Sequence, residues 1–138
     1  MKLELTPEQR SMLVDAACQV RAWSYSPYSH YAVGAALLTA SGRVYDGVNV
    51  ENASFPLCIC AERATIYKAV SHGEKEFIAI AVVTENGGSP CGACRQVMAE
   101  FGLDAVVIIA DSRGKIHQET TVSELLPGAF TPADLPHL

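Results

Sequence analysis

Two short segments of the chain carry residues that bind metal ions. The segment Cys60–Glu62 supplies a thiol and a carboxylate, and the segment Pro90–Cys94 supplies two further thiols, those of Cys91 and Cys94. Thiolates are good zinc ligands, and a catalytic zinc ion has three protein ligands and a fourth position open to water. The three cysteines therefore predict a zinc site, with the Glu62 carboxylate close to the open position without being a ligand.

Glu62 adds a group that can move a proton. Zinc lowers the pKa of a bound water molecule to about 7, and a neighbouring carboxylate can accept the released proton and pass it to a substrate. A His or Cys ligand followed by x-Glu, and later by Pro-Cys-x-x-Cys, is the signature of zinc nucleobase deaminases, which replace a ring amino group by oxygen. The two segments match this signature.

Arg63 and the starts of two predicted helices bear on the charge of this site. Three thiolates around one zinc ion leave a net negative charge. Arg63 directly follows Glu62 and could donate hydrogen bonds to the thiolates; the alternative is a solvated surface arginine. Both cysteine segments also lie where a loop or strand enters a predicted helix, and a helix N-terminus favours thiolates.

Two other interpretations of the cysteines stay open. A structural zinc ion usually has four Cys or His ligands, and Cys58 is the candidate for the fourth. It lies only two residues before Cys60, too close to form the usual Cys-x2-Cys pair with it. Cys91 and Cys94 have the spacing of a redox motif, but such a motif follows the first strand of its fold, whereas this pair comes late in the chain. The open, catalytic site is the favoured interpretation.

The composition predicts one compact domain that acts on small molecules. The chain has 138 residues, of which 49% are hydrophobic and 18% charged, and we expect a single domain over residues 1–138. The formal net charge of −5 offers no basic field for a phosphate backbone, so no nucleic-acid partner is expected.

The cysteines and the hydropathy indicate a reducing environment. No apolar run approaches the ~20 residues of a membrane span, and Met1–Arg10 lacks the apolar core of a signal peptide. The chain has five cysteines, an odd number, and clustered cysteines in such a chain are more typical of metal binding or catalysis than of disulfides. We therefore expect a cytoplasmic protein without a membrane partner.

The remaining pattern predicts a layered α/β domain with a mixed sheet, because helices alternate with apolar strands. Thr6, Pro7 and Gln9 have the spacing of an N-terminal capping box. The predicted helices are Leu5–Ser24, Cys60–Val70 and Cys91–Phe101, with a helical turn near Ser123–Leu126. The predicted strands are Val33–Leu38, Arg43–Asn49, Phe77–Val83, Ala105–Ala110 and Ile116–Thr121.

Five longer segments extend the match over nearly the whole chain. They are Tyr25–Ala36, Asn49–Ser54, Cys60–Arg63, Pro90–Gln96 and Leu125–Phe130. With these segments in this order, the chain resembles the short-chain, homotetrameric, zinc-dependent cytidine deaminases. The resemblance implies a three-layer α/β/α fold with a mixed sheet of roughly five strands. It also implies one zinc ion per chain, bound by Cys60, Cys91 and Cys94.

The resemblance further implies a reaction and a substrate. Cytidine, and usually 2′-deoxycytidine, would be hydrolysed to uridine or 2′-deoxyuridine and ammonia, as a step of pyrimidine salvage. Zinc-activated water would attack the base, and Glu62 would carry the proton. The alternative is a related zinc deaminase that acts on a modified cytidine, a nucleoside antibiotic or a free base.

Five further residues receive roles from the resemblance alone. Asn49 and Glu51 would hold the ribose 3′-hydroxyl. Tyr31 would pack against the nucleoside, and the backbone at Ala61 would contact the pyrimidine. Phe130 would stack on a base bound to a neighbouring subunit, so that the active sites of the homotetramer would be shared. Turn capping is the alternative for Asn49 and Glu51, and ordinary packing is the alternative for Phe130.

Overall fold

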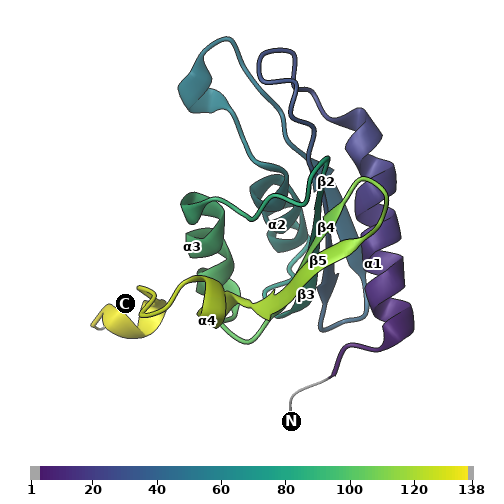
Figure 1. Ribbon diagram of the computed structural model, residues 1–138. Helices are drawn as coiled ribbons and strands as arrows, with labels where there is room; N and C mark the ends of the chain where they lie inside the picture. Colours follow the sequence, from purple (N-terminus) through teal and green to yellow (C-terminus); the bar gives the residue numbers. More distant parts are fainter. Residues whose placement is uncertain (1–3, 137–138) are drawn as a thin grey trace.

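The computed structural model describes residues 4–136, which form three layers (Figure 1). A five-stranded sheet is the middle layer, with the strand order β2-β1-β3-β4-β5. Helix α1 covers one face of the sheet, and α2 and α3 cover the other. The predicted three-layer α/β/α fold is therefore confirmed. The single domain expected over residues 1–138 includes residues outside the described part, and it stays a prediction.

The sheet is mixed, as predicted. Strand β1 pairs antiparallel with both β2 and β3, β3 and β4 run parallel, and β4 and β5 are antiparallel. The parallel pair needs a crossover connection, which α3 provides. The strands are β1 Gly34–Thr39, β2 Val44–Val48, β3 Phe77–Thr84, β4 Val106–Asp111 and β5 Ile116–Thr121.

The helices begin close to the predicted residues. In α1, the Thr6 hydroxyl accepts from the Gln9 N–H and the Gln9 side chain accepts from the Thr6 N–H, which confirms the capping box. The α-helices are α1 Pro7–Val20, α2 Ala61–Ser71, α3 Gly92–Phe101 and α4 Val122–Leu125. The 3-10 helices are η1 Arg21–Trp23, η2 Phe55–Leu57 and η3 Pro132–Asp134.

Three local differences from the sequence prediction have simple causes. The N-terminal helix was expected to reach Ser24, but its last turn tightens into the 3-10 helix η1. Tightening of the last turn is common where a helix ends, and the chain must turn before Pro27. The short helices η2 and η3 were not predicted, because a single turn leaves no helical periodicity to detect.

Alternate residues of the buried strands serve the two faces of the sheet. In β1, Ala35 and Leu37 pack in the cluster beneath α2 and α3, whereas Ala36 and Leu38 pack in the cluster beneath α1. This period of two is the expected geometry of a strand covered on both sides. Small residues let α1 approach closely, and at Gly34 a Cβ would lie 2.2 Å from the carbonyl oxygen of Ala17.

Three loops meet at one end of the sheet, where β1 begins and β2 and β3 end. Gly34, the first residue of β1, pairs with Val48 at the end of β2 and with Val83 near the end of β3. The loops before β1, after β2 and after β3 therefore start from neighbouring points. Isolated bridges of Val50 with Tyr25 and with Ile59 hold two of these loops together. The functional residues predicted from the sequence lie mostly on these loops and on the helix starts that follow them.

Replacing Gly34 by Ala is expected to destabilise the fold. The added Cβ collides with backbone, so α1 or β1 must move. Overpacking of this kind lowers the free energy of unfolding by about 1–3 kcal/mol, which urea denaturation measures. Gly102→Ala is the matched control, because a Cβ there meets no atom within 4 Å. Equal stability of the two variants would contradict this account of the α1–sheet contact.

Candidate metal centre and substrate pocket

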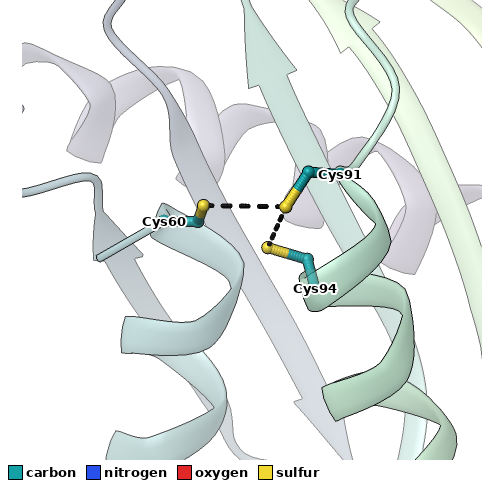
Figure 2. Close-up of side chains that lie close together, drawn as sticks. All are labelled: Cys60, Cys91 and Cys94. Carbon is teal, nitrogen blue, oxygen red and sulfur yellow. Dashed lines mark hydrogen bonds between the residues drawn. The ribbon is translucent and has the colours of Figure 1, made fainter. Parts of the chain in front are cut away.

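Three thiols converge from the starts of two helices (Figure 2). Cys60 is the N-cap residue of α2, Cys91 is the N-cap residue of α3, and Cys94 lies in the first turn of α3. The Cys91 sulfur is 3.9 Å from that of Cys60 and 3.5 Å from that of Cys94. The sulfur atoms all lie within 4.8 Å of one another.

These distances fit one tetrahedral zinc ion. Zn–S bonds of about 2.3 Å in a tetrahedron place the sulfur atoms about 3.8 Å apart, close to the spacing observed. They are far from the roughly 2.05 Å of a disulfide, and all five cysteines of the chain are free. Within residues 4–136, no other group of three Cys, His, Asp or Glu side chains gathers as a possible metal site.

Cys58 does not complete a closed site. Its sulfur accepts a hydrogen bond from the Asn52 N–H at 3.3 Å and donates to the Asn52 carbonyl oxygen at 3.7 Å. It is not part of the group formed by Cys60, Cys91 and Cys94. The thiol cluster therefore has three protein ligands, the number that leaves a catalytic zinc ion one position for water.

Hydrogen bonds among the thiols and from Arg63 favour ionisation at Cys60. The bond from the Cys94 thiol, followed by that from the Arg63 guanidinium, lowers the pKa of Cys60 to about 5 against the effect of burial. The Arg63 Nη2 atom lies 3.3 Å from the Cys60 sulfur. The interaction with Cys60 raises the pKa of Cys94, so Cys60 becomes a thiolate before Cys94 does.

Glu62 is almost completely buried next to this cluster. Its side chain is 4% exposed, and it lines the pocket in front of the thiols. Burial is the main cause that raises the pKa of its carboxyl, and the neighbouring Cys60 thiolate adds to the effect. A carboxyl that titrates closer to neutral pH is suited to both accept and donate a proton.

The pocket has a volume of about 330 Å³. This is at the lower end of the range for small-molecule sites. Most of the predicted site residues contribute to its walls, namely Tyr31, Asn49, Glu51, Cys60, Glu62, Arg63 and Cys91. Thr84, Gly88 and Ser89 also line it and were not predicted. Thr84 is the last residue of β3, and Gly88 and Ser89 lie on the loop between β3 and α3, which leads to Cys91.

Asn49 organises the loop before β1 as well as lining the pocket. Its Oδ1 atom accepts from the Ser24 hydroxyl and, at 2.9 Å, from the Val33 N–H. Its Nδ2 atom donates to the Tyr31 carbonyl oxygen at 2.8 Å. An amide nitrogen carries two N–H groups, so one donor of Asn49 is left for a ligand.

Glu51 makes the turn-capping contacts that were the alternative to its substrate role. Its Oε1 atom accepts from the N–H groups of Tyr28 and Ser29 at 3.0 and 3.1 Å, and its Oε2 atom accepts from the Ser29 hydroxyl. These bonds lower the pKa of the Glu51 carboxyl, and the bond from the Ser29 hydroxyl has the largest effect. Two carboxylate oxygens accept about four bonds, so the capping contacts leave Glu51 able to bind a ligand as well.

The remaining predicted residues lie in different places. Ala61 is fully buried as the first residue of α2. Tyr31 is partly exposed in the pocket wall. Phe130 is 55% exposed and does not line the pocket of its own chain. It belongs to the C-terminal segment, which extends away from the three layers (Figure 1).

Arg95 connects the metal site to the C-terminal segment, and sequence reasoning did not single it out. Its Nε and Nη2 atoms donate to the Pro90 carbonyl oxygen and the Ser89 hydroxyl at 2.9 and 2.8 Å. Its Nη1 atom donates to the Leu125 carbonyl oxygen at 2.7 Å. The only sequence signal for Arg95 was its place inside the segment Pro90–Gln96. Two of its three hydrogen bonds go to backbone oxygens, which every residue has, so no partner side chain marks these bonds in the sequence.

Comparison with known proteins identifies the family. The sequence profile described as "Cytidine and deoxycytidylate deaminase zinc-binding region" matches residues 7–110, which is most of the chain. The chain belongs to the cytidine and deoxycytidylate deaminase family. As a member of this family it is a hydrolytic enzyme, and the three converging thiols fit the single zinc ion that was predicted.

Individual relatives share both the sequence and the fold of this deaminase. A cytidine deaminase from Halalkalibacterium halodurans is 53% identical over 129 residues, covering 91% of this chain and 97% of the relative. One from Sporosarcina psychrophila is 48% identical over 126 residues, covering 89% and 92%. The crystal structure of cytidine deaminase from Burkholderia pseudomallei superposes with a TM-score of 0.82 at 47% identity, covering 86% of this chain and 97% of that one.

The described residues of the deaminase include no helix with the length and apolar character that crossing a membrane requires. The longest helix, α1, has 14 residues and a polar face with charged side chains.

Replacing Cys91 by Ala is expected to remove zinc from the deaminase. Two thiols leave the ion with fewer ligands than its site needs. Zinc per chain, measured by elemental analysis after dialysis against a chelator, should fall well below one. Cys58→Ala is the matched control, since Cys58 lies two residues from a ligand but outside the cluster, and it should retain zinc. Loss of zinc from both variants would contradict the three-thiol assignment.

Proposed function

We propose that the protein hydrolyses cytidine and 2′-deoxycytidine to uridine and 2′-deoxyuridine, with release of ammonia. The observation that carries this proposal is the buried Glu62 carboxyl beside three thiols at the wall of a pocket of about 330 Å³. The relatives named above are cytidine deaminases, which supports the same substrate here. The reaction would return the pyrimidine nucleoside for reuse in the cell.

Glu62 would carry protons in both halves of the reaction. Zinc bound by the three thiolates would supply Lewis-acid activation of a water molecule. Glu62 would accept a proton from the attacking water and place it on the ring nitrogen next to the carbon under attack. It would then take the remaining proton of the added hydroxyl group and pass it to the exocyclic amino group, so that the carbonyl of the product forms as the C–N bond breaks and ammonia leaves. The burial that raises the pKa of Glu62 supports this exchange.

Arg63 and the two helix starts would offset the charge of the thiolates. The Arg63 guanidinium contacts the Cys60 sulfur. Cys60 and Cys91 are N-cap residues, so the positive ends of α2 and α3 face the cluster. Both contributions would keep an electron-rich set of ligands compatible with the activation of water.

The nucleoside would be held by groups on the loops around the pocket. Asn49 and Glu51 would bind the ribose 3′-hydroxyl, through the free N–H of the amide and the remaining acceptor capacity of the carboxylate. The Glu51 charge would also disfavour a nucleotide phosphate, which favours the free nucleoside. The Ala61 N–H has no acceptor within α2, because it lies in the first turn, and this supports its proposed contact with the pyrimidine. Tyr31 would pack against the nucleoside.

The alternative is a related deaminase that acts on a modified cytidine, a nucleoside antibiotic or a free base. A free base would not use Asn49 and Glu51, so it is the least favoured of these. A polynucleotide substrate is disfavoured by the net charge of −5. Turnover of cytidine and of deoxycytidine, compared with that of free cytosine, separates the alternatives.

Glu62→Gln is expected to lower turnover strongly without removing zinc. The amide keeps the shape of the side chain but cannot accept the proton from water. The loss of a general acid–base group lowers kcat by about 10²–10⁴-fold, measured from the ultraviolet absorbance change of cytidine. Glu100→Gln, on the outer face of α3, is the matched control and should be fully active. Near-normal turnover by Glu62→Gln would refute the proposed role.

We also propose that the enzyme is a cytoplasmic homotetramer with shared active sites. Large apolar side chains on the loops near the pocket are exposed, which is typical of a surface that another copy covers. They are Trp23, Tyr25, Tyr28, Phe55 and Leu57. The exposed Phe130 would reach the pocket of a neighbouring subunit. The proposed location is supported by the thiolate site, which needs reduced cysteines.

Two defective variants are expected to complement each other in a mixed oligomer. Glu62→Ala removes the proton carrier but retains Phe130, and Phe130→Ala does the reverse. If Phe130 acts on a neighbouring site, coexpressed subunits form some sites that combine an intact Glu62 with a partner's intact Phe130. The purified mixed oligomer should then exceed the cytidine turnover predicted from the average of the two parents. Turnover equal to that average would place Phe130 outside the shared site.

A further inference from the structure

Tyr31 connects two loops that are far apart in the sequence. It lies on the loop before β1, and its hydroxyl donates a 2.9 Å hydrogen bond to the Oδ1 atom of Asn86. Asn86 lies 55 residues later, on the loop between β3 and α3 that leads to the zinc ligand Cys91. Asn86 itself does not line the pocket, whereas Tyr31 does.

The loop between β3 and α3 is shaped around the Tyr31 hydroxyl. The Gly88 N–H donates to the Thr84 hydroxyl at 2.7 Å, and that hydroxyl lies 3.4 Å from Asn86 Oδ1. A Cβ at Gly88 would lie 2.3 Å from the Tyr31 hydroxyl oxygen. The backbone of Gly88, unlike that of Gly87, is not in the left-handed region. Glycine is therefore needed at position 88 for space and not for backbone conformation.

From these contacts we infer that Asn86 is a positioning residue of the active site, which acts through the Tyr31 hydroxyl. The hydrogen bond fixes the Tyr31 ring in the pocket wall and connects the loop between β3 and α3 to the loop before β1. Gly88 provides the gap through which the hydroxyl passes. This inference rests on the proposed function, because its effect is on the binding of the nucleoside.

The effect is expected in substrate binding rather than in the chemical step. The backbone of Tyr31 is held independently, because its carbonyl oxygen accepts from Asn49 and its N–H donates to the Ser29 hydroxyl. Loss of the Asn86 bond therefore frees the Tyr31 ring and the loop between β3 and α3, while the Tyr31 backbone stays in place. The substrate must then order both when it binds. Glu62 and the three thiols are untouched.

Asn86→Ala is expected to raise the KM for cytidine about 3–10-fold, as the loss of one modest hydrogen bond does. The kcat and the zinc content should stay within about two-fold of wild type. Asn86→Asp keeps an acceptor for the Tyr31 hydroxyl and should restore the KM, which a merely structural role of the loop would not require. Glu85→Ala, at the preceding exposed position, is the matched control.

Gly88→Ala tests the same contact from the other side. In the wild-type background the methyl group displaces the Tyr31 hydroxyl, so both the KM and the melting temperature should worsen. In the Tyr31→Phe background the nearest atoms, the ring Cζ and Thr84 Oγ1, would lie 3.6 Å from the new Cβ, an ordinary contact. The double variant Tyr31→Phe/Gly88→Ala should therefore match Tyr31→Phe alone in both measurements.

The possible outcomes separate this inference from the proposed function. A zinc-loaded wild-type protein that is inactive on cytidine and deoxycytidine would refute the proposed function. An active wild type whose Asn86→Ala variant has the same KM would overturn only the inference. So would an Asn86→Asp variant no better than Asn86→Ala. A Gly88→Ala penalty in melting temperature of equal size in both backgrounds would overturn it without reference to turnover.

Discussion

The structure depends on one spatial requirement, which is that three sulfur atoms from two distant segments come within 4.8 Å of one another. Cys60 and Cys91 meet because each is the residue at which a helix starts, and both helices lie on the same face of the sheet. The buried strands fix the distance between those helix starts. A zinc ion would be bound by side chains that the backbone has already brought together, so little ordering would be left for the metal.

The pocket beside the thiols shows how few residues perform several tasks. Asn49 and Glu51 were candidates for substrate contacts, with turn capping as the alternative, and their hydrogen bonds show that they brace the loop before β1. The two roles are compatible, because an amide and a carboxylate each have more bonding capacity than the loop uses. Polar side chains that would be ligands of a substrate are thereby held in fixed orientations before it arrives.

Much of this architecture could be predicted from the sequence, because its signals are local. The Thr6–Gln9 capping box, the apolar strand at Phe77–Thr84 and the cysteine spacings each lie within a few residues. The bond between Tyr31 and Asn86 joins residues far apart in the chain, and neither residue type indicates the other. Arg95 was missed for a related reason, since backbone carbonyl oxygens leave no trace in the side-chain pattern. The early end of α1 reflects the path of the chain after Val20 rather than a weak helical sequence.

The attachment of the C-terminal segment has a consequence for its variability. Arg95 and Gln96, neighbours on α3, donate to the carbonyl oxygens of Leu125 and Phe130. Every residue type has such an oxygen, so these bonds hold the course of the segment whatever side chains it carries. The helix that supplies two of the three thiols thus anchors the segment through contacts that do not depend on the segment's side chains. Sequence change there can alter what the segment presents while leaving its attachment to the metal-bearing helix intact.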